Sequence, residues 1–159
     1  MNLGMLGAGV VMGLAAIGSA FGIGIAGQGA IGAWKRCYVN NKPAPFILTV
    51  FAGAPLTQTI YGFLLTRSIL DSGQNPLFLL GLGVAAGLAM GASAVAQGQA
   101  GAAGSDALGE TGKGFASYIM VVGLCETVAL FVMAFGIGFC LGVTILTGSV
   151  TGIDHASRT

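Results

Sequence analysis

Charged residues are scarce in this sequence: of its 159 residues, only 7% are Asp, Glu, Lys or Arg, and the formal net charge is +1. A domain that binds nucleic acid needs a dense cluster of Lys and Arg to neutralise phosphates, and the sequence has no such cluster. We therefore expect no nucleic-acid partner.

Metal-binding and redox residues are also few. The three cysteines are an odd number, widely spaced and without a Cys-x-x-Cys pair, and the single histidine, His155, stands in a polar tail where we expect it to be solvated. Neither a cysteine–histidine metal centre nor a disulfide framework is indicated. Gly112-Lys113 is not part of a phosphate-binding loop, because Ala107 stands at its first glycine and Gly114 at its hydroxyl position. We therefore expect no nucleotide to bind this chain.

Most of the sequence consists of long runs without charged residues. Residues 1–34, 43–66 and 72–105 contain no Asp, Glu, Lys or Arg, and residues 114–153 contain only Glu126. Each run exceeds the ~20 residues that cross a bilayer as a helix. The first run has no Lys or Arg before its apolar part, so we interpret it as a retained span rather than a secretory signal. The prediction is an all-α membrane protein with four transmembrane helices, at about residues 4–34, 46–66, 76–104 and 115–148.

The basic residues predict an orientation. The first and third connections carry four of them, and the second connection and the C-terminal tail carry one each: Lys35, Arg36, Lys42 and Lys113 against Arg67 and Arg158. Because cytoplasmic loops of membrane proteins are enriched in Lys and Arg, connections one and three are predicted to be cytoplasmic and both termini external.

Glycine is concentrated in two of the spans. Ten of the 29 glycines lie between Gly4 and Trp34, and span three is similarly rich. In lipid, small residues at this spacing let helix backbones approach closely. At an offset of 69 residues, five positions of span one coincide with span three: Gly18, Gly22, Gln28, Gly29 and Gly32 with Gly87, Gly91, Gln97, Gly98 and Gly101. We therefore predict a duplicated two-span hairpin, with residues 1–70 and 71–159 as the two copies.

Polar groups in span two lie on one helical face. They follow the spacing i, i+3, i+4 and i+7: Ala54, Thr57, Gln58 and Tyr61. Pro55 has no N–H to donate, so it should bend the helix and allow nearby carbonyls to turn toward a neighbour or an ion. The alternative is that Thr57 bonds back to its own helix and Gln58 joins two spans.

Glu126 is an intramembrane carboxylate, and such groups usually mark ion or substrate pathways because an ionised side chain costs about 2.5–3.5 kcal/mol at the bilayer centre. A hard monovalent cation in a dry site needs several oxygen ligands and one negative charge. Glu126 could supply the charge, and neutral oxygens could come from Thr57, Gln58, Gln97 and a carbonyl near Ala54. A proton site needs only the carboxylate, so the amides favour Na⁺ over H⁺. A protonated, purely structural Glu126 is the alternative.

Taken together, these residues resemble the rotor-ring proteolipid of V-type ATPases, also known as the c or K subunit. The resemblance rests on Pro55-x-Thr57-Gln58-x-x-Tyr61-Gly62-Phe63, Ala96-Gln97-Gly98 and Glu126-Thr127, and it is strongest to the bacterial sodium-translocating branch. It implies Na⁺ ligands at Thr57, Gln58, Gln97, Glu126 and the Ala54 carbonyl. It also implies that Tyr61 bonds the carboxylate and that Pro55 supports the site.

The same resemblance implies the surroundings of the chain. They are identical copies in a ring with the glycine-rich spans inside, lipid, a stator membrane subunit with a cationic group, and central-stalk subunits at the cytoplasmic loops. The polar third connection, with Asp106, Glu110 and Lys113, is expected to be a solvated turn facing a partner. Nucleotide hydrolysis would occur on other subunits, so the chain alone is expected not to be an enzyme, and its expected location is a bacterial plasma membrane.

Two other functions stay open at this stage. One is the same rotor subunit translocating H⁺. The other is a small proton-coupled exporter, which the glycine-dense spans disfavour because they suit tight helix packing better than a substrate cavity.

Overall fold

The computed structural model describes residues 2–142, and within that range it contains helices and no strand. The elements in chain order are α1 (Leu3–Val39), α2 (Leu48–Gly53), a 3-10 turn η1 (Ala54–Leu56), α3 (Thr57–Leu70), α4 (Pro76–Thr111) and α5 (Phe115–Cys140). Because α2, η1 and α3 are continuous, they form one rod, and the described residues contain four rods long and apolar enough to cross a membrane. The predicted all-α, four-span class is confirmed. His155, Arg158 and residues 143–148 of the predicted fourth span lie outside the described residues.

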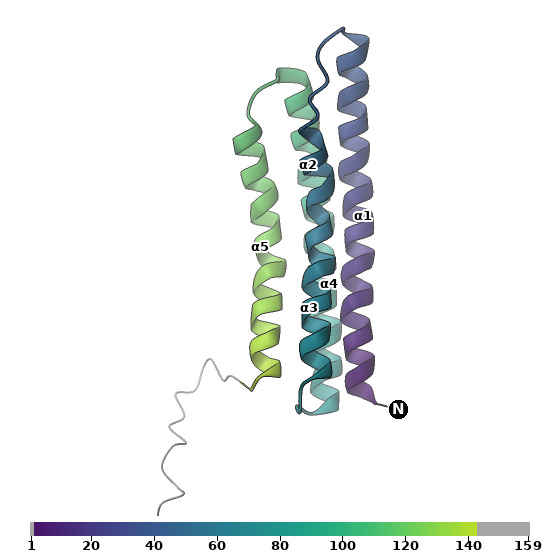
Figure 1. Ribbon diagram of the computed structural model, residues 1–159, viewed down its shortest axis with the longest axis vertical. Helices are drawn as coiled ribbons and strands as arrows, with labels where there is room; N and C mark the ends of the chain where they lie inside the picture. The colour runs from purple at the N-terminus through teal and green to yellow at the C-terminus, as the bar shows by residue number, and fades with distance from the viewer. Residues whose placement is uncertain (1, 143–159) are drawn as a thin grey trace, which may run out of the picture.

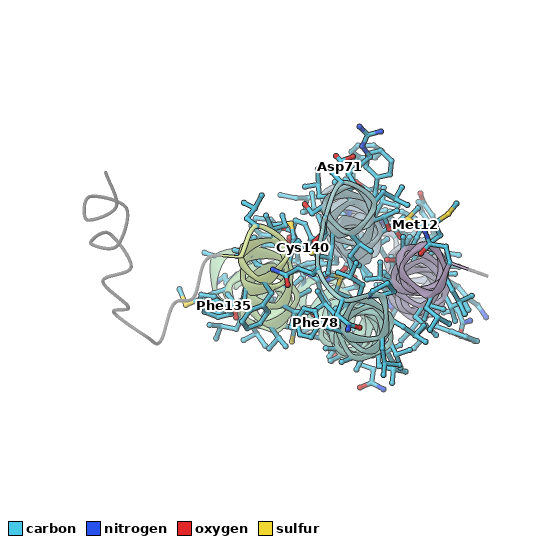
Figure 2. The ribbon with its side chains drawn as sticks, turned by 90° about the horizontal axis from the view of Figure 1, so that it is seen from below. Met12, Asp71, Phe78, Phe135 and Cys140 are labelled. Carbon is cyan, nitrogen blue, oxygen red and sulfur yellow. The ribbon has the colours of Figure 1, made fainter. Side chains whose placement is uncertain are left out.

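The four rods run side by side as a bundle (Figure 1). Seen along the bundle, α1 and α5 occupy opposite corners of a diamond, with Met12 near one corner and Phe135 near the other, while α3 and α4 lie between them (Figure 2). The connections after α1 and after α4 lie at the same end of the bundle (Figure 1). Four of the six basic residues used to predict the orientation therefore lie at this end: Lys35, Arg36, Lys42 and Lys113.

Direct backbone contact holds α1 against α4. A Cβ added to Gly18 would lie 2.2 Å from the Cα of Gly91, and a Cβ added to Gly98 would lie 2.2 Å from the carbonyl oxygen of Gly22. Only glycine fits at such distances. The close approach predicted from the glycine spacing is therefore found, and it occurs between α1 of the first hairpin and α4 of the second.

Helix ends follow local capping more closely than charge. The side chain of Asn2 accepts a hydrogen bond from the Gly4 amide at the start of α1, and Asn75 accepts one from Leu77 at the start of α4. The α4 helix stops where Gly112 adopts a φ of 66°, in the left-handed region that favours glycine. Pro55 interrupts the α-helical pattern of the second rod with the turn η1, as its missing N–H predicts.

The predicted turn at Asp106 and Glu110 was wrong, although both side chains are exposed as expected of solvated residues. Both residues lie on α4, and both carboxylates pair with Arg36 of α1, Glu110 at 3.2 Å. Charged residues indicate where a membrane helix leaves the lipid. The helix can continue into water beyond that point until a capping residue ends it. Only the short segment around Lys113 connects α4 to α5.

Burial is matched at some pairs that the predicted offset of 69 makes and not at others. Gln97 is fully buried, whereas Gln28, its counterpart at that offset, is exposed. An offset of 74 pairs Ser19 with Ser93, which are both buried. An offset of 68 in the outer rods pairs Gln58 with Glu126. The division into two hairpins and the offset between them both stay predictions.

Candidate functional site

Glu126 lies near the middle of α5, half-buried, and both of its carboxylate oxygens accept hydrogen bonds. The Tyr61 hydroxyl of α3 donates to Oε1 at 2.6 Å, and Nε2 of Gln97 on α4 donates to Oε2 at 3.3 Å. Since an uncompensated carboxylate is costly away from water, these two donors stabilise the charge within the bundle. Residues from three separate rods therefore meet at Glu126.

Two fully buried amides join the rods behind the carboxylate. Gln58 and Gln97 both have 0% exposed side chains. Nε2 of Gln58 donates to Oε1 of Gln97 at 2.8 Å, and Nε2 of Gln97 also donates to the carbonyl of Val122 at 3.2 Å. Each amide thus gives the other a hydrogen-bond partner, and neither is buried unpaired.

Thr57 and the Ala54 carbonyl form the α3 edge of this group. The Thr57 hydroxyl donates to the Ala54 carbonyl at 3.1 Å and lies 3.4 Å from Oε1 of Gln58. This back-bond is the alternative considered for Thr57, and it places the hydroxyl, the carbonyl and the Gln58 amide oxygen together. Pro55 is buried, and it packs on α1, since a Cβ at Gly22 would lie 2.7 Å from the Pro55 Cβ.

A continuous chain of hydrogen bonds therefore links five of the seven residues expected at the site: Thr57, Gln58, Gln97, Glu126 and Tyr61. Ala54 joins through its carbonyl, whereas Pro55 contributes shape and takes no part in the chain.

The sequence reasoning missed Ser93 and two backbone carbonyls of α5. The Ser93 hydroxyl donates to the Cys125 carbonyl at 2.7 Å and lies 3.4 Å from Nε2 of Gln58. Ser93 stands one helical turn before Gln97, so the i, i+4 spacing on α4 was the available signal. Cys125, which had no assigned role, contributes its carbonyl.

Chemically, the site offers oxygen ligands and a single negative charge. Among residues 2–142, no cluster of three His, Cys, Asp or Glu side chains could hold a transition metal. Hard cations prefer oxygen ligands, and one carboxylate balances one positive charge. One carboxylate on α5 and the neutral oxygens of Thr57, Gln58 and Ala54 on the second rod are of the type that a monovalent cation binds, whereas Gln97 turns its NH₂ group to the carboxylate and its oxygen to Gln58.

Comparison with known proteins shows which sequences this chain resembles. Residues 80–139, which cover most of α4 and all but the last residue of α5, match the family model that describes the C subunit of ATP synthase. The chain is 34% identical over 178 residues to the K subunit of the A-type ATP synthase of Methanocaldococcus jannaschii, across 97% of this chain and 78% of the relative.

Proposed function

This multi-pass membrane chain belongs to the rotor-ring proteolipid family of A- and V-type ATP synthases, and we propose that each copy carries one Na⁺ across the membrane at Glu126. The proposed ligands are the Glu126 carboxylate, the side-chain oxygens of Thr57, Gln58 and Gln97, and the Ala54 carbonyl. Tyr61 holds the carboxylate in position, and Pro55 supports the bend beside it.

The pair of buried amides carries this proposal. A proton carrier needs only a carboxylate, whereas Gln58 and Gln97 are two primary amides withdrawn completely from water. Burying an amide is unfavourable unless it is fully bonded. Their contact at 2.8 Å uses one lone pair of the Gln97 oxygen and none of the Gln58 oxygen, so both oxygens keep a lone pair that a cation can use and a proton carrier does not need.

Transport follows from the charge balance of the site. With Na⁺ bound, the negative charge of Glu126 is neutralised, so the loaded site can face lipid at low cost. A cationic group on a stator subunit then weakens the hold of the carboxylate, and the ion leaves through a half-channel. Identical copies form the ring, with α1 and α4 inside and surrounding lipid against α3 and α5.

Rotation of this ring couples ion flow to nucleotide turnover on other subunits, and the chain by itself performs no catalysis. Central-stalk subunits contact the end of the bundle that carries Lys35, Arg36 and Lys113. We propose that this end is cytoplasmic and that the ring lies in a bacterial plasma membrane.

Carbodiimide modification of Glu126 tests the choice of ion. The reagent attacks a free carboxyl, so Na⁺ bound at the site should slow modification of the intact ring at fixed pH, while the same concentration of K⁺ controls for ionic strength. Glu126→Gln gives the background level of labelling. If only pH changes the rate and Na⁺ has no effect, the ring carries H⁺ and the sodium proposal fails.

The exporter alternative has no comparable support. A groove of about 290 Å³ between α1 and α4 is lined only by apolar residues and glycines, and Glu126 is not among them. It gives a polar substrate no group to bind.

A further inference from the structure

Ser93 lies beside the ion site and belongs to none of the ligand positions proposed above. Its side chain is on α4, with 6% of its surface exposed, and it touches groups on two other rods. It donates to the Cys125 carbonyl of α5 at 2.7 Å, and its oxygen lies 3.4 Å from Nε2 of Gln58 on α3.

The Cys125 carbonyl determines what Ser93 can do for Gln58. A serine hydroxyl has one hydrogen, and here that hydrogen is given to a carbonyl, which can only accept. The Ser93 oxygen is then left as an acceptor. Only the NH₂ end of the Gln58 amide can lie against it, because the amide oxygen has no hydrogen to offer.

This arrangement fixes which end of Gln58 meets a cation. Nε2 of Gln58 lies 2.8 Å from Oε1 of Gln97 and 3.4 Å from the Ser93 oxygen, so its NH₂ end faces two acceptors of α4. The amide oxygen is left on the side of the Thr57 hydroxyl and the Ala54 carbonyl. A reversed amide would present hydrogens to the cation and would remove one of its oxygen ligands.

We propose that Ser93 is a positioning residue that, together with Oε1 of Gln97, holds the orientation of the Gln58 amide and thereby raises the affinity of the site for Na⁺. This inference rests on the proposed sodium function. It concerns a hydroxyl that acts through Gln58 and does not itself contact the ion.

Three variants of the intact ring separate this role from packing. Ser93→Ala removes the acceptor, Ser93→Thr keeps the hydroxyl, and Ser105→Ala removes another fully buried hydroxyl of α4 that has no hydrogen-bond partner among the described residues. The readout is the Na⁺ concentration that half-protects Glu126 from carbodiimide, with labelling in the absence of Na⁺ and its pH profile measured alongside.

We expect Ser93→Ala to raise the half-protecting Na⁺ concentration about three- to tenfold, the range expected when one neutral hydrogen bond is lost. The pH profile without Na⁺ should stay unchanged, since the carboxylate keeps its own two donors. Ser93→Thr and Ser105→Ala should behave as wild type. Ser93→Gly serves as a second hydroxyl-free variant if the alanine ring does not assemble.

Each outcome decides the matter. Wild-type protection in both Ser93→Ala and Ser93→Gly overturns the role of Ser93 while leaving the sodium function intact. A Ser93→Thr ring as weak as Ser93→Ala also overturns it, because the defect would then come from shape. If Na⁺ fails to protect the wild-type ring, the sodium function fails and the inference falls with it.

Discussion

Replacing Gly98 with alanine should force α1 and α4 apart next to the ion site. The new Cβ would lie 2.2 Å from the carbonyl oxygen of Gly22, 2.5 Å from its Cα and 2.7 Å from its carbonyl carbon. Cβ contacts below 3.0 Å are essentially never found. The two backbones must therefore separate by roughly 1 Å before the overlap is relieved.

The size of the effect follows from what the methyl group meets. Overpacking costs about 1–3 kcal/mol, and a main-chain carbonyl cannot turn aside as a flexible side chain can, so the upper end applies at Gly98. Alanine returns about 1 kcal/mol through its better helix propensity. The net loss of unfolding free energy is about 2 kcal/mol, or roughly a thirtyfold fall in the ratio of folded to unfolded protein.

Reversible unfolding in mixed micelles measures this loss. The chain has one tryptophan, Trp34, whose indole N–H donates to the Pro45 carbonyl at 2.8 Å, so its fluorescence reports on the folded bundle. Gly32→Ala is the matched control, because a Cβ there meets nothing within 4 Å. Equal stability of the Gly98→Ala and Gly32→Ala proteins would refute the packing argument.

Two further predictions concern the carboxylates. Tyr61→Phe removes the 2.6 Å hydrogen bond to Glu126, and because bonds to charged groups contribute about 1.5–3 kcal/mol, Na⁺ affinity should fall at least about tenfold in the protection assay. Unchanged protection would contradict the positioning role of Tyr61. Arg36→Ala breaks exposed pairs with Asp106 and Glu110, so the free energy of unfolding should fall by less than about 1 kcal/mol, and less still in high salt. A loss of several kcal/mol would show that the pairs are not solvent-screened.

The number and type of the helices could be predicted because lipid imposes a length and excludes charge. The start of α4 at Pro76 was predictable to the residue, since Asn75 and Pro76 are strong N-terminal signals. The far end of α4 was not, because charged residues such as Asp106 and Glu110 after an apolar run are typical of a turn. In the folded protein Arg36 pairs with both of them across the two helices, and no local pattern reveals that pairing.

The site residues that the sequence singled out share an unusual chemistry for their surroundings. An acid and two amides in apolar runs stand out, and so did the helical face that includes Thr57 and Tyr61. Ser93 did not stand out, because a serine in a glycine- and alanine-rich span resembles another small packing residue. Its partner is the main-chain carbonyl of Cys125, and because every residue has such a carbonyl, the sequence cannot indicate which one accepts the bond.

The offset of 69 residues stays a prediction. In a chain with 29 glycines, several coincide at many offsets by composition alone, so glycine spacing does not by itself define the register of a repeat.

Contact between main chains gives α1 and α4 a mechanical property that side-chain packing would not. Gly18 contacts Gly91 and Gly22 contacts Gly98 without any side chain between them. No rotamer change can therefore relieve a sliding movement of one helix along the other, which main-chain atoms oppose directly. We therefore expect the α1–α4 pair to resist bending and shear. In the ring proposed above, torque applied at the end that carries Arg36 should reach the level of Glu126 with little twist within each copy.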